Sequence, residues 1–427
     1  MAANNEPIAG IAPDTDVDYQ GQVELRKKAP ASAATLRCLV ALIAAHEPDL
    51  RDRLSFFCKR QYIARSKYEL PPGPLWTFGV TVPVRGCTWV GDVLSYRAFA
   101  YCSSLTDITL PPTLTEIGED AFNGCRSLTE ITLPPNLTEI GKYGFAHCSS
   151  LREITLPPTL TKVGEGTFKS CWSLAKITLP LTLTNIGKYG FAHCSSLRKI
   201  TLPPTLTEIG EGAFAHCLSL AEFSLSPNLT KIRRQAFANC TSLTKITLPP
   251  TLTEIGEDAF NGCRSLTEIA LPFALAKIGD MAFCDCTSLV EVALPPSLAK
   301  IGVGAFQGCT SLTKVTLPPT LEVIGKCVFQ FCTSLTEIML PPTLSKIGKF
   351  AFKGCTSLTE MTLPPFREYE RIRWIGRQAF SGCTSLTEIT LPGPRDVVNI
   401  GSFAFEGCPG TPRRCQTPLE RPAWRLP

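Results

Sequence analysis

The stretch "SLTDITLPPTLTEIGEDAFNGCR" at residues 104–126 is one unit of a repeat that fills most of the chain. The period is 23 residues, and two segments six periods apart, 108–131 and 246–269, are identical. A single unit holds too few apolar residues to bury them by itself, so neighbouring units must cover one another. A period of this size over hundreds of residues therefore predicts a solenoid in which each unit forms one turn.

Two residue types mark the period. A phenylalanine recurs at steps of 23 residues and, near the end, at one step of 28 and one of 25. A cysteine follows each phenylalanine by three positions, so fourteen of the twenty cysteines belong to the repeat. Stacked turns place these thiols in a line, where we expect them to be buried and reduced rather than gathered around a metal ion. The phenylalanines are Phe99, Phe122, Phe145, Phe168, Phe191, Phe214, Phe237, Phe260, Phe283, Phe306, Phe329, Phe352, Phe380 and Phe405.

The first half of the unit predicts a short strand. In residues 104–112, Ile108 and Leu110 alternate with polar residues, which is typical of a strand with one buried face. Pro111 and Pro112 end it, because proline has no backbone N–H to donate to a neighbouring strand. The sequence therefore predicts a sheet with one strand from each turn.

The second half of the unit predicts the return to the core. Leu114 and Ile117 are expected to point inward, and Gly118 permits a turn. The following "EDAFNGC" predicts a short helical or irregular corner with Ala121 and Phe122 inside. The fold class is thus a leucine-rich-repeat parallel β-solenoid with short helical or irregular corners.

Composition divides the chain into four parts. Residues 1–29 are expected to be disordered, and 30–76 to form a helical cap, because solenoid ends need covering. Residues 77–408 hold about fourteen solenoid turns. Residues 409–427 are rich in proline and arginine and are expected to be a disordered tail.

The frame L-x-x-I-x-L-P followed by I-G-x-x-A-F-x-x-C resembles the BspA-type leucine-rich repeats. The match extends over residues from about 78 to 408. The resemblance implies a curved or twisted parallel solenoid that binds other proteins. It also implies an alternative function, because the best-known members are exported adhesins on the surface of bacteria and protists.

The bulk composition narrows the function. The net charge is only +5 over 427 residues, and basic and acidic residues are interspersed, which is not typical of a nucleic-acid-binding surface. The N-terminal residues lack the pattern of a secretory signal, and the first apolar run, "LRCLVALIAA" at 36–45, is too short to span a membrane. We therefore expect a cytoplasmic protein without membrane insertion.

The exposed face of the predicted strands is the candidate binding surface for a protein partner. Two columns run along it, one charged and one rich in threonine, and both also suit a solvated sheet. The charged column contains Asp107, Glu130, Glu153, Lys176, Lys199, Glu222, Lys245, Glu268, Glu291 and Lys314. The threonine column contains Thr109, Thr132, Thr155, Thr178 and Thr201.

The later turns break both patterns. Ala270, Ala293 and Met339 interrupt the threonine column, and Phe273 stands where most units have the second proline. These apolar substitutions point to the middle and late turns as the binding region. We expect no catalytic residues and no cofactor, because no acid–base pair stands apart from the repeat.

The histidines next to periodic cysteines require separate consideration. His147, His193 and His216 precede a cysteine, but glycine fills the same slot six times. Since glycine, asparagine and aspartate also occupy this slot, it reads as an exposed corner position with a turn conformation. The sequence therefore predicts no metal site there.

Three short matches leave alternatives open. Residues 30–68 weakly resemble an F-box, which would make the protein a substrate receptor of a ubiquitin ligase. The segment Pro409–Arg414 matches PxxPxR, a ligand pattern of SH3 domains. Asn136, Asn228 and Asn239 begin glycosylation sequons, which matter only in an exported chain. The F-box-like match rests on Leu36, Leu39, Val40, Ile43, Asp49, Leu50, Leu54, Phe57, Cys58 and Lys59.

Overall fold

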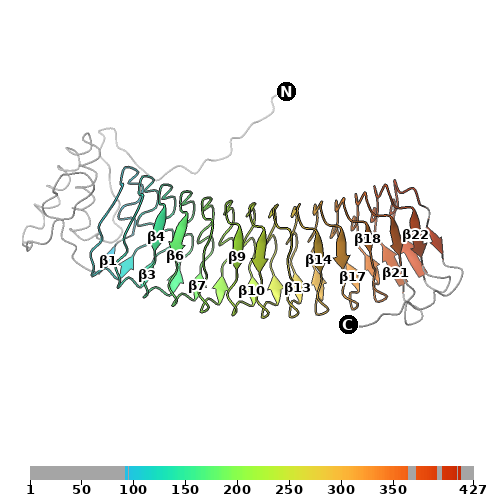
Figure 1. Ribbon diagram of the computed structural model, residues 1–427, viewed down its shortest axis with the longest axis horizontal. Coiled ribbons are helices and arrows are strands. Elements are labelled where there is room, and N and C mark those ends of the chain that lie inside the picture. Colours follow the sequence, from blue (N-terminus) through green and yellow to red (C-terminus); the bar gives the residue numbers. More distant parts are fainter. Residues whose placement is uncertain (1–91, 95, 364–371, 392–396, 411, 415–427) are drawn as a thin grey trace, which may run out of the picture.

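The structure, a computed structural model, describes residues 92–94, 96–363, 372–391, 397–410 and 412–414. These residues form one long, gently arched solenoid, in which successive repeat units lie side by side along the axis (Figure 1). The predicted disordered segment 1–29, the helical cap 30–76 and the F-box-like region lie outside the described residues, as does most of the predicted tail.

Sheet 1 is the sheet that the sequence predicted. Its strands pair in parallel, and the three-residue strands carry an exposed–buried–exposed pattern around one buried apolar residue. Between the strands, single bridges such as Thr109–Thr132 and Glu268–Glu291 continue the row. Its strands are β4 (Glu153–Thr155), β6 (Lys176–Thr178), β9 (Glu222–Ser224), β11 (Lys245–Thr247), β14 (Glu291–Ala293), β16 (Lys314–Thr316), β18 (Glu337–Ile338), β20 (Glu360–Thr362), β22 (Glu388–Leu391) and β24 (Arg413–Arg414).

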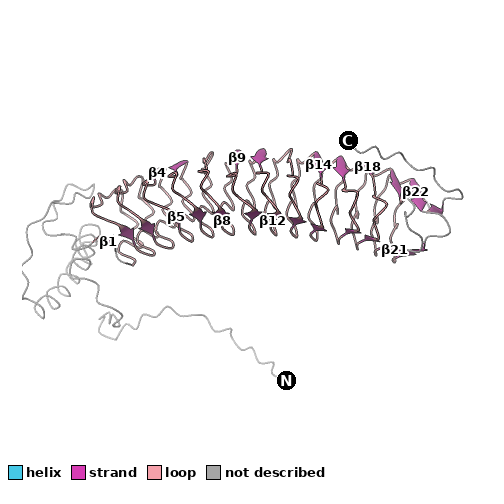
Figure 2. Ribbon diagram, turned by 90° about the horizontal axis from the view of Figure 1, so that it is seen from below, coloured by secondary structure: helices cyan, strands magenta, loops and turns pink. Residues whose placement is uncertain are grey.

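Sheet 2 is a second parallel row that the sequence analysis missed. Ile117 was expected only to point inward, but it ends a two-residue strand, and an equivalent strand of two or four residues occurs in every later described turn. Figures 1 and 2 show the two rows running separately along the solenoid. The strands are β1 (Val93–Leu94), β2 (Glu116–Ile117), β3 (Glu139–Ile140), β5 (Lys162–Val163), β7 (Asn185–Ile186), β8 (Glu208–Ile209), β10 (Lys231–Ile232), β12 (Glu254–Ile255), β13 (Lys277–Ile278), β15 (Lys300–Ile301), β17 (Val323–Ile324), β19 (Lys346–Ile347), β21 (Ile372–Ile375) and β23 (Val397–Ile400).

The periodic phenylalanines form a continuous stack through the core. Each ring lies 5.1–5.7 Å from the next, with the planes within 17° of parallel, from Phe99 to Phe405. From the first of these fourteen rings to the last, the chain completes thirteen turns. Phe223 adds edge-to-face contacts to Phe214 and Phe237. The stack joins each turn to its neighbours and confirms the predicted solenoid.

The periodic cysteines are free thiols, and all are buried except half-buried Cys102 and Cys408. Besides packing in the core, these thiols donate hydrogen bonds. The thiol of Cys125 donates a hydrogen bond of 3.1 Å to the backbone carbonyl of Phe99 in the preceding turn, and Cys408 does the same to Phe380 at 3.2 Å. The equivalent bond recurs in every turn between them. The thiols therefore satisfy a buried carbonyl as well as the core packing.

The corner of each turn is built from tight turns, and none of the described residues is helical. The slot before the periodic cysteine has a positive φ in all fourteen units, from 56° at Asp285 to 78° at Gly124. Glycine, asparagine and aspartate suit this left-handed conformation, which explains their frequency there. The expectation that the slot is exposed was wrong for several units: Ser170 is buried, and His193 and His216 are half-buried, because side chains of adjacent turns cover one another.

Hydroxyl side chains replace the backbone donors that the proline pairs lack. Thr182 follows Pro180 and Leu181, the equivalent of such a pair, and its Oγ1 donates to the carbonyls of Pro158 at 2.8 Å and Leu160 at 2.9 Å in the preceding turn. Thr205, Thr251 and Thr343 make the equivalent pairs of bonds. Threonine in this position therefore links the turns where the sheet cannot continue.

The C-terminal end corrects one predicted boundary. The solenoid was expected to end at residue 408, followed by a disordered tail. Instead, Arg413 and Arg414 form β24 and pair in parallel with Thr390 and Leu391 of β22. The end of the PxxPxR match is thus part of sheet 1, because β22 still offers unpaired backbone groups at its outer edge.

Candidate binding surfaces

The face of sheet 1 presents the predicted charged column to solvent. Apart from half-buried Asp107, its ten predicted members are all exposed. Lys176 forms an ion pair with Glu153, and Lys245 pairs with Glu268 at 3.1 Å. Neighbouring strands thus place opposite charges side by side, which is the favourable cross-strand arrangement.

The predicted threonine column differs from the other threonines of the turn. Thr109, Thr132, Thr155, Thr178 and Thr201 are all exposed, and in the described part of the chain none of their hydroxyls bonds to another residue. Threonines at other positions, such as Thr184 and Thr253, donate to the preceding turn. The hydroxyls of the predicted column are therefore available to a partner.

Large apolar side chains are exposed at the predicted interruptions. Phe273 is 78% exposed and Met339 is 62% exposed. Leu181, which occupies the same position as Phe273 four turns earlier, is 74% exposed. The structure confirms their exposure, although these residues lie several turns apart and do not form one patch.

The face of sheet 2 contains a groove that the sequence analysis did not find. It has a volume of about 880 Å³ and lies across the turns of β3, β5, β7 and β8. Its lining residues include Gly141, Gly164, Gly187 and Gly210. A Cβ atom on Gly210 would lie 2.6 Å from the backbone of Gly187 in the preceding turn, so glycine is required for the turns to stack there.

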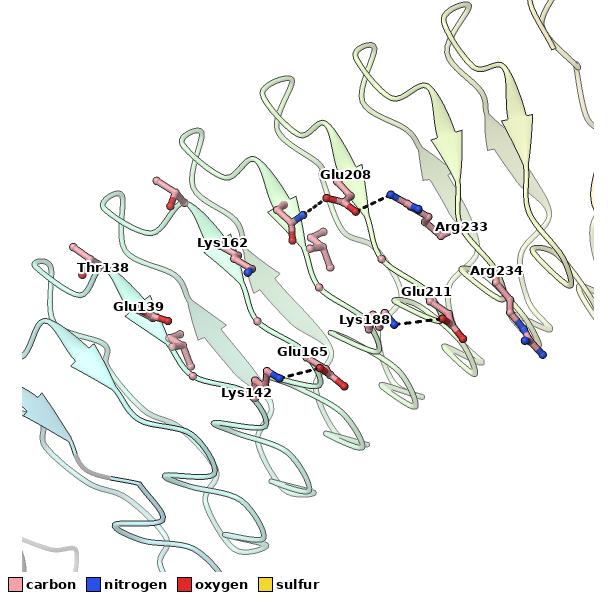
Figure 3. Close-up of a pocket in the computed structure, with 18 residues that line it drawn as sticks. Thr138, Glu139, Lys142, Lys162, Glu165, Lys188, Glu208, Glu211, Arg233 and Arg234 are labelled. Atoms are coloured by element: carbon pink, nitrogen blue, oxygen red, sulfur yellow. Dashed lines mark hydrogen bonds and ion pairs between the residues drawn. The ribbon is translucent and has the colours of Figure 1, made fainter. Parts of the chain in front are cut away.

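Charged side chains of alternating sign line both sides of this groove. Lys142 pairs with Glu165 at 3.5 Å, and Lys188 pairs with Glu211 at 3.8 Å (Figure 3). At one end Arg233 stands in the glycine column, and its guanidinium lies 3.1 Å from the carboxylate of Glu208. The Glu208 carboxylate also accepts a hydrogen bond from the amide of Asn185 at 2.7 Å. In the sequence, this groove could have been recognised from the column of glycines between two columns of charged residues.

The histidine column has the geometry of stacked rings. The rings of His193 and His216 are 4.4 Å apart and nearly parallel. Burial lowers the pKa of His193, and the neighbouring His216, Lys169 and His147 lower it further, which favours the neutral imidazole. Within the described residues, no three His, Cys, Asp or Glu side chains are grouped so that they could hold a metal ion.

The periodic thiols are poor nucleophiles. Burial raises the pKa of Cys171, Cys194 and Cys217 well above the ordinary 9.0, since the thiolate loses its hydration. Partly exposed Cys408 is the exception, because a hydrogen bond with Cys383 lowers its pKa. Thiolate chemistry is therefore suppressed along almost the whole column.

The repeat frame, the two parallel sheets and the stacked core together match a known family. The family described as "BspA type Leucine rich repeat region (6 copies)" matches residues 92–221, 161–289, 253–370 and 366–415. The chain belongs to the BspA-type leucine-rich repeat family. Sixteen of its cysteines are free thiols in the described region, and the periodic ones give this BspA-type protein its cysteine ladder.

Solved structures of bacterial proteins are similar to this BspA-type protein. A leucine-rich repeat protein from Bacteroides ovatus is 31% identical, with a TM-score of 0.61, over 71% of this chain and 88% of that one. A leucine rich cell surface protein from Faecalibacterium prausnitzii is 25% identical, with a TM-score of 0.43, over 77% and 86%. The leucine-rich repeat protein of T. pallidum is 30% identical, with a TM-score of 0.39, over 47% and 92%. No protein with a curated description matches the chain.

The described part of this BspA-type protein contains no helix with the length and apolar character needed to cross a membrane.

Proposed function

We propose that this BspA-type protein is a non-catalytic scaffold that binds a protein partner on the face of sheet 1. The observation that carries this proposal is the free threonine column beside the exposed charged column. Threonines elsewhere in each turn donate hydrogen bonds between turns, whereas Thr109, Thr132, Thr155, Thr178 and Thr201 do not. A rigid row of free hydroxyls and charges is suited to recognition of another protein surface.

Reversing two charges on sheet 1 is expected to remove the partner. In Lys176→Glu with Lys199→Glu, two carboxylates replace exposed ammonium groups in the middle of the charged column. Like-charge contacts across an interface are strongly unfavourable, so we expect retention of the partner to fall at least tenfold, about 1.4 kcal/mol. The measurement is affinity capture from the source cells with the full chain, followed by quantitative mass spectrometry.

The matched control is Lys142→Glu with Lys188→Glu on the face of sheet 2. These lysines are also exposed, and each of them pairs with a glutamate. The control is expected to retain the partner at the wild-type level. Equal retention by both double variants would reject the face of sheet 1, and capture of no protein at all would reject the scaffold function.

We further propose that the protein acts in the cytoplasm. The free thiols of the core support this, because cysteines that lie one turn apart remain unpaired most safely in a reducing compartment. The exported adhesin remains the competing function, since Asn136 and Asn228 begin sequons and are both exposed.

The glycosylation state tests the compartment. We expect the protein isolated from its own cells to have the unmodified mass, because a cytoplasmic chain does not meet the glycosylation machinery. Peptides containing Asn136 and Asn228 should be recovered unmodified by mass spectrometry. Glycans on either residue would instead favour export and the adhesin.

A further inference from the structure

The face of sheet 2 changes its electrostatic character along the solenoid. In the turns up to β13, the described basic side chains of this face, except Lys162, have acidic partners in a neighbouring turn. Lys231 lies 3.2 Å from Glu254, Lys277 pairs with the same glutamate, and Arg234 lies 3.5 Å from Glu257. These contacts lower the pKa of Glu254, chiefly through its hydrogen bond with Lys277. The nine turns from β1 to β13 are therefore close to neutral on this face.

The next four turns, which contain β15, β17, β19 and β21, carry cations that form no ion pair with any described residue. Five basic side chains on this face are exposed, and among the described residues none of them lies within ion-pair distance of a carboxylate. Glu322, in the column next to that of Lys300 and Lys346, is an exposed acidic side chain in these turns. The five cations are Lys300, Lys326, Lys346, Lys349 and Arg377.

Exposed apolar side chains lie among these cations. Val303 is 41% exposed, Val323 is 45% exposed and Trp374 is 55% exposed. Trp374 is directly opposite Lys346 in the register of β19 and β21. From β2 to β13 the same positions hold charged or polar side chains, and only the turn of β1, with Val93 and Tyr96, also exposes apolar ones there. Among the described turns of this face, exposed apolar residues therefore occur together with several unpaired cations in this part.

Gly348 and Gly376 lie between the charged positions of adjacent turns. A Cβ atom on Gly376 would lie 2.6 Å from the backbone of Gly348, so the turns approach closely there. Four stacked turns extend over about 15 Å at ~4.8 Å per strand. An extended peptide of roughly five residues has this length.

We propose that Lys300, Lys326, Lys346, Lys349, Arg377, Val303, Val323 and Trp374, here called the basic patch, bind an acidic protein segment that also carries apolar side chains. The proposal names a second surface and the chemistry of its ligand, and it rests on the proposed scaffold function. Lys277 and Lys300 are opposite one another in the register of β13 and β15, an unfavourable pairing of like charges. Carboxylates bound nearby would relieve this repulsion.

The apolar residues favour a peptide over a nucleic acid. A phosphate backbone would satisfy the five cations but would leave Val303 and Val323 against charged oxygens. An acidic segment with leucine or phenylalanine between its carboxylates would pair the cations and also cover the valines and Trp374. The basic patch thus has the composition of a peptide site with both charged and apolar contacts.

The direct test measures fluorescence anisotropy of a labelled peptide of alternating glutamate and leucine, titrated with the full chain. We expect saturable binding that weakens as salt is added, because the cations are exposed. Lys300→Glu with Lys346→Glu should weaken the Kd at least tenfold. Trp374→Ala should weaken it several-fold without changing the salt dependence, since this side chain contributes apolar contact only.

Two matched variants separate this site from the rest of the molecule. Lys142→Glu with Lys188→Glu reverses charges on the same face in the paired region, and Lys176→Glu with Lys199→Glu does so on sheet 1. Both should bind the peptide within about twofold of the wild type, a difference typical of peripheral charges. Circular dichroism should show that all three double variants melt as wild type, because every substituted side chain is exposed.

Three outcomes would overturn the proposal. The first is absence of peptide binding, and the second is equal weakening by all three double variants. The third is tighter binding of single-stranded oligothymidylate than of the peptide at the same salt concentration, which would make the patch a nucleic-acid site. Capture of the cellular partner by the Lys300→Glu, Lys346→Glu variant would still support the scaffold function, so the two proposals can fail separately.

Discussion

Raising the pH above 9 is expected to unfold this solenoid steeply. Twelve periodic thiols are completely buried, and burial holds the pKa of each above its ordinary 9.0, for example at about 12 for Cys240 and Cys355. In the unfolded chain the same thiols ionise near 9. The folded protein therefore retains protons that the unfolded chain has lost, and each retained proton reduces the free energy of unfolding by about 1.4 kcal/mol per pH unit.

The raised pKa values determine whether the free energy of unfolding rises or falls with pH, and over which pH range it changes. The contribution of the thiols to stability is fully present below pH 9 and is lost progressively as the pH rises from 9 towards the folded-state pKa values. With twelve thiols the loss is on the order of 10 kcal/mol per pH unit, comparable to the whole stability of an ordinary domain. Urea unfolding curves followed by circular dichroism at pH 7, 8, 9 and 10 would measure it.

A double variant provides the control for the alkaline transition. Cys194→Ala with Cys217→Ala removes two of the buried thiols, so the pH slope should become shallower by about 3 kcal/mol per pH unit. The same variant should be less stable at pH 7, since two hydrogen bonds to Phe168 and Phe191 are lost. An unfolding midpoint that is the same at pH 8 and pH 10 would show that the thiols ionise within the folded core.

Phe214→Ala is expected to produce the largest effect of any single core substitution. Its ring is completely buried, stacks 5.4 Å from Phe191 and 5.5 Å from Phe237, and meets Phe223 edge-on at 5.0 Å. We expect a loss of about 3–5 kcal/mol in the free energy of unfolding. Because turns are stabilised by their nearest neighbours, the N-terminal and C-terminal parts should also unfold in separate steps.

Phe273→Ala is the matched control, since the same change is made at a side chain that is 78% exposed. Its free energy of unfolding should stay within about 0.5 kcal/mol of the wild type. Chemical denaturation with probes in both parts of the solenoid would measure the two variants. A single, unshifted transition for Phe214→Ala would contradict the aromatic stack as the continuous link between turns.

Sheet 1 and the core were predictable, while sheet 2 was not. Ile108 and Leu110 alternate with polar residues over enough positions to indicate a strand. The strands of sheet 2 are mostly two residues long, as in Glu116–Ile117, and too short to show any alternation. They form because each pairs with the equivalent strand of the preceding turn, which in most turns lies 23 residues earlier in the sequence.

Each turn contains a second residue with a positive φ, and this conformation was also not predictable from the sequence. The slot before the cysteine often contains glycine or asparagine, and this composition indicates its backbone conformation. The other slot contains Tyr143, Met281, Cys327 and Phe350, all with φ between 54° and 61°. Such residues rarely adopt this conformation in isolation, so only the stacked neighbours can impose it.

The candidate binding surfaces were likewise only partly predictable from the sequence. The sequence by itself determined the repeat, the buried phenylalanine and cysteine columns and the exposed column of sheet 1, because a fixed period places equivalent residues in equivalent environments. Only the tertiary structure decided which charges neutralise one another. Lys231 forms an ion pair with Glu254 of the next turn, whereas Lys346 lies opposite Trp374, which has no charge. Side chains far apart in the sequence become neighbours only when the turns stack.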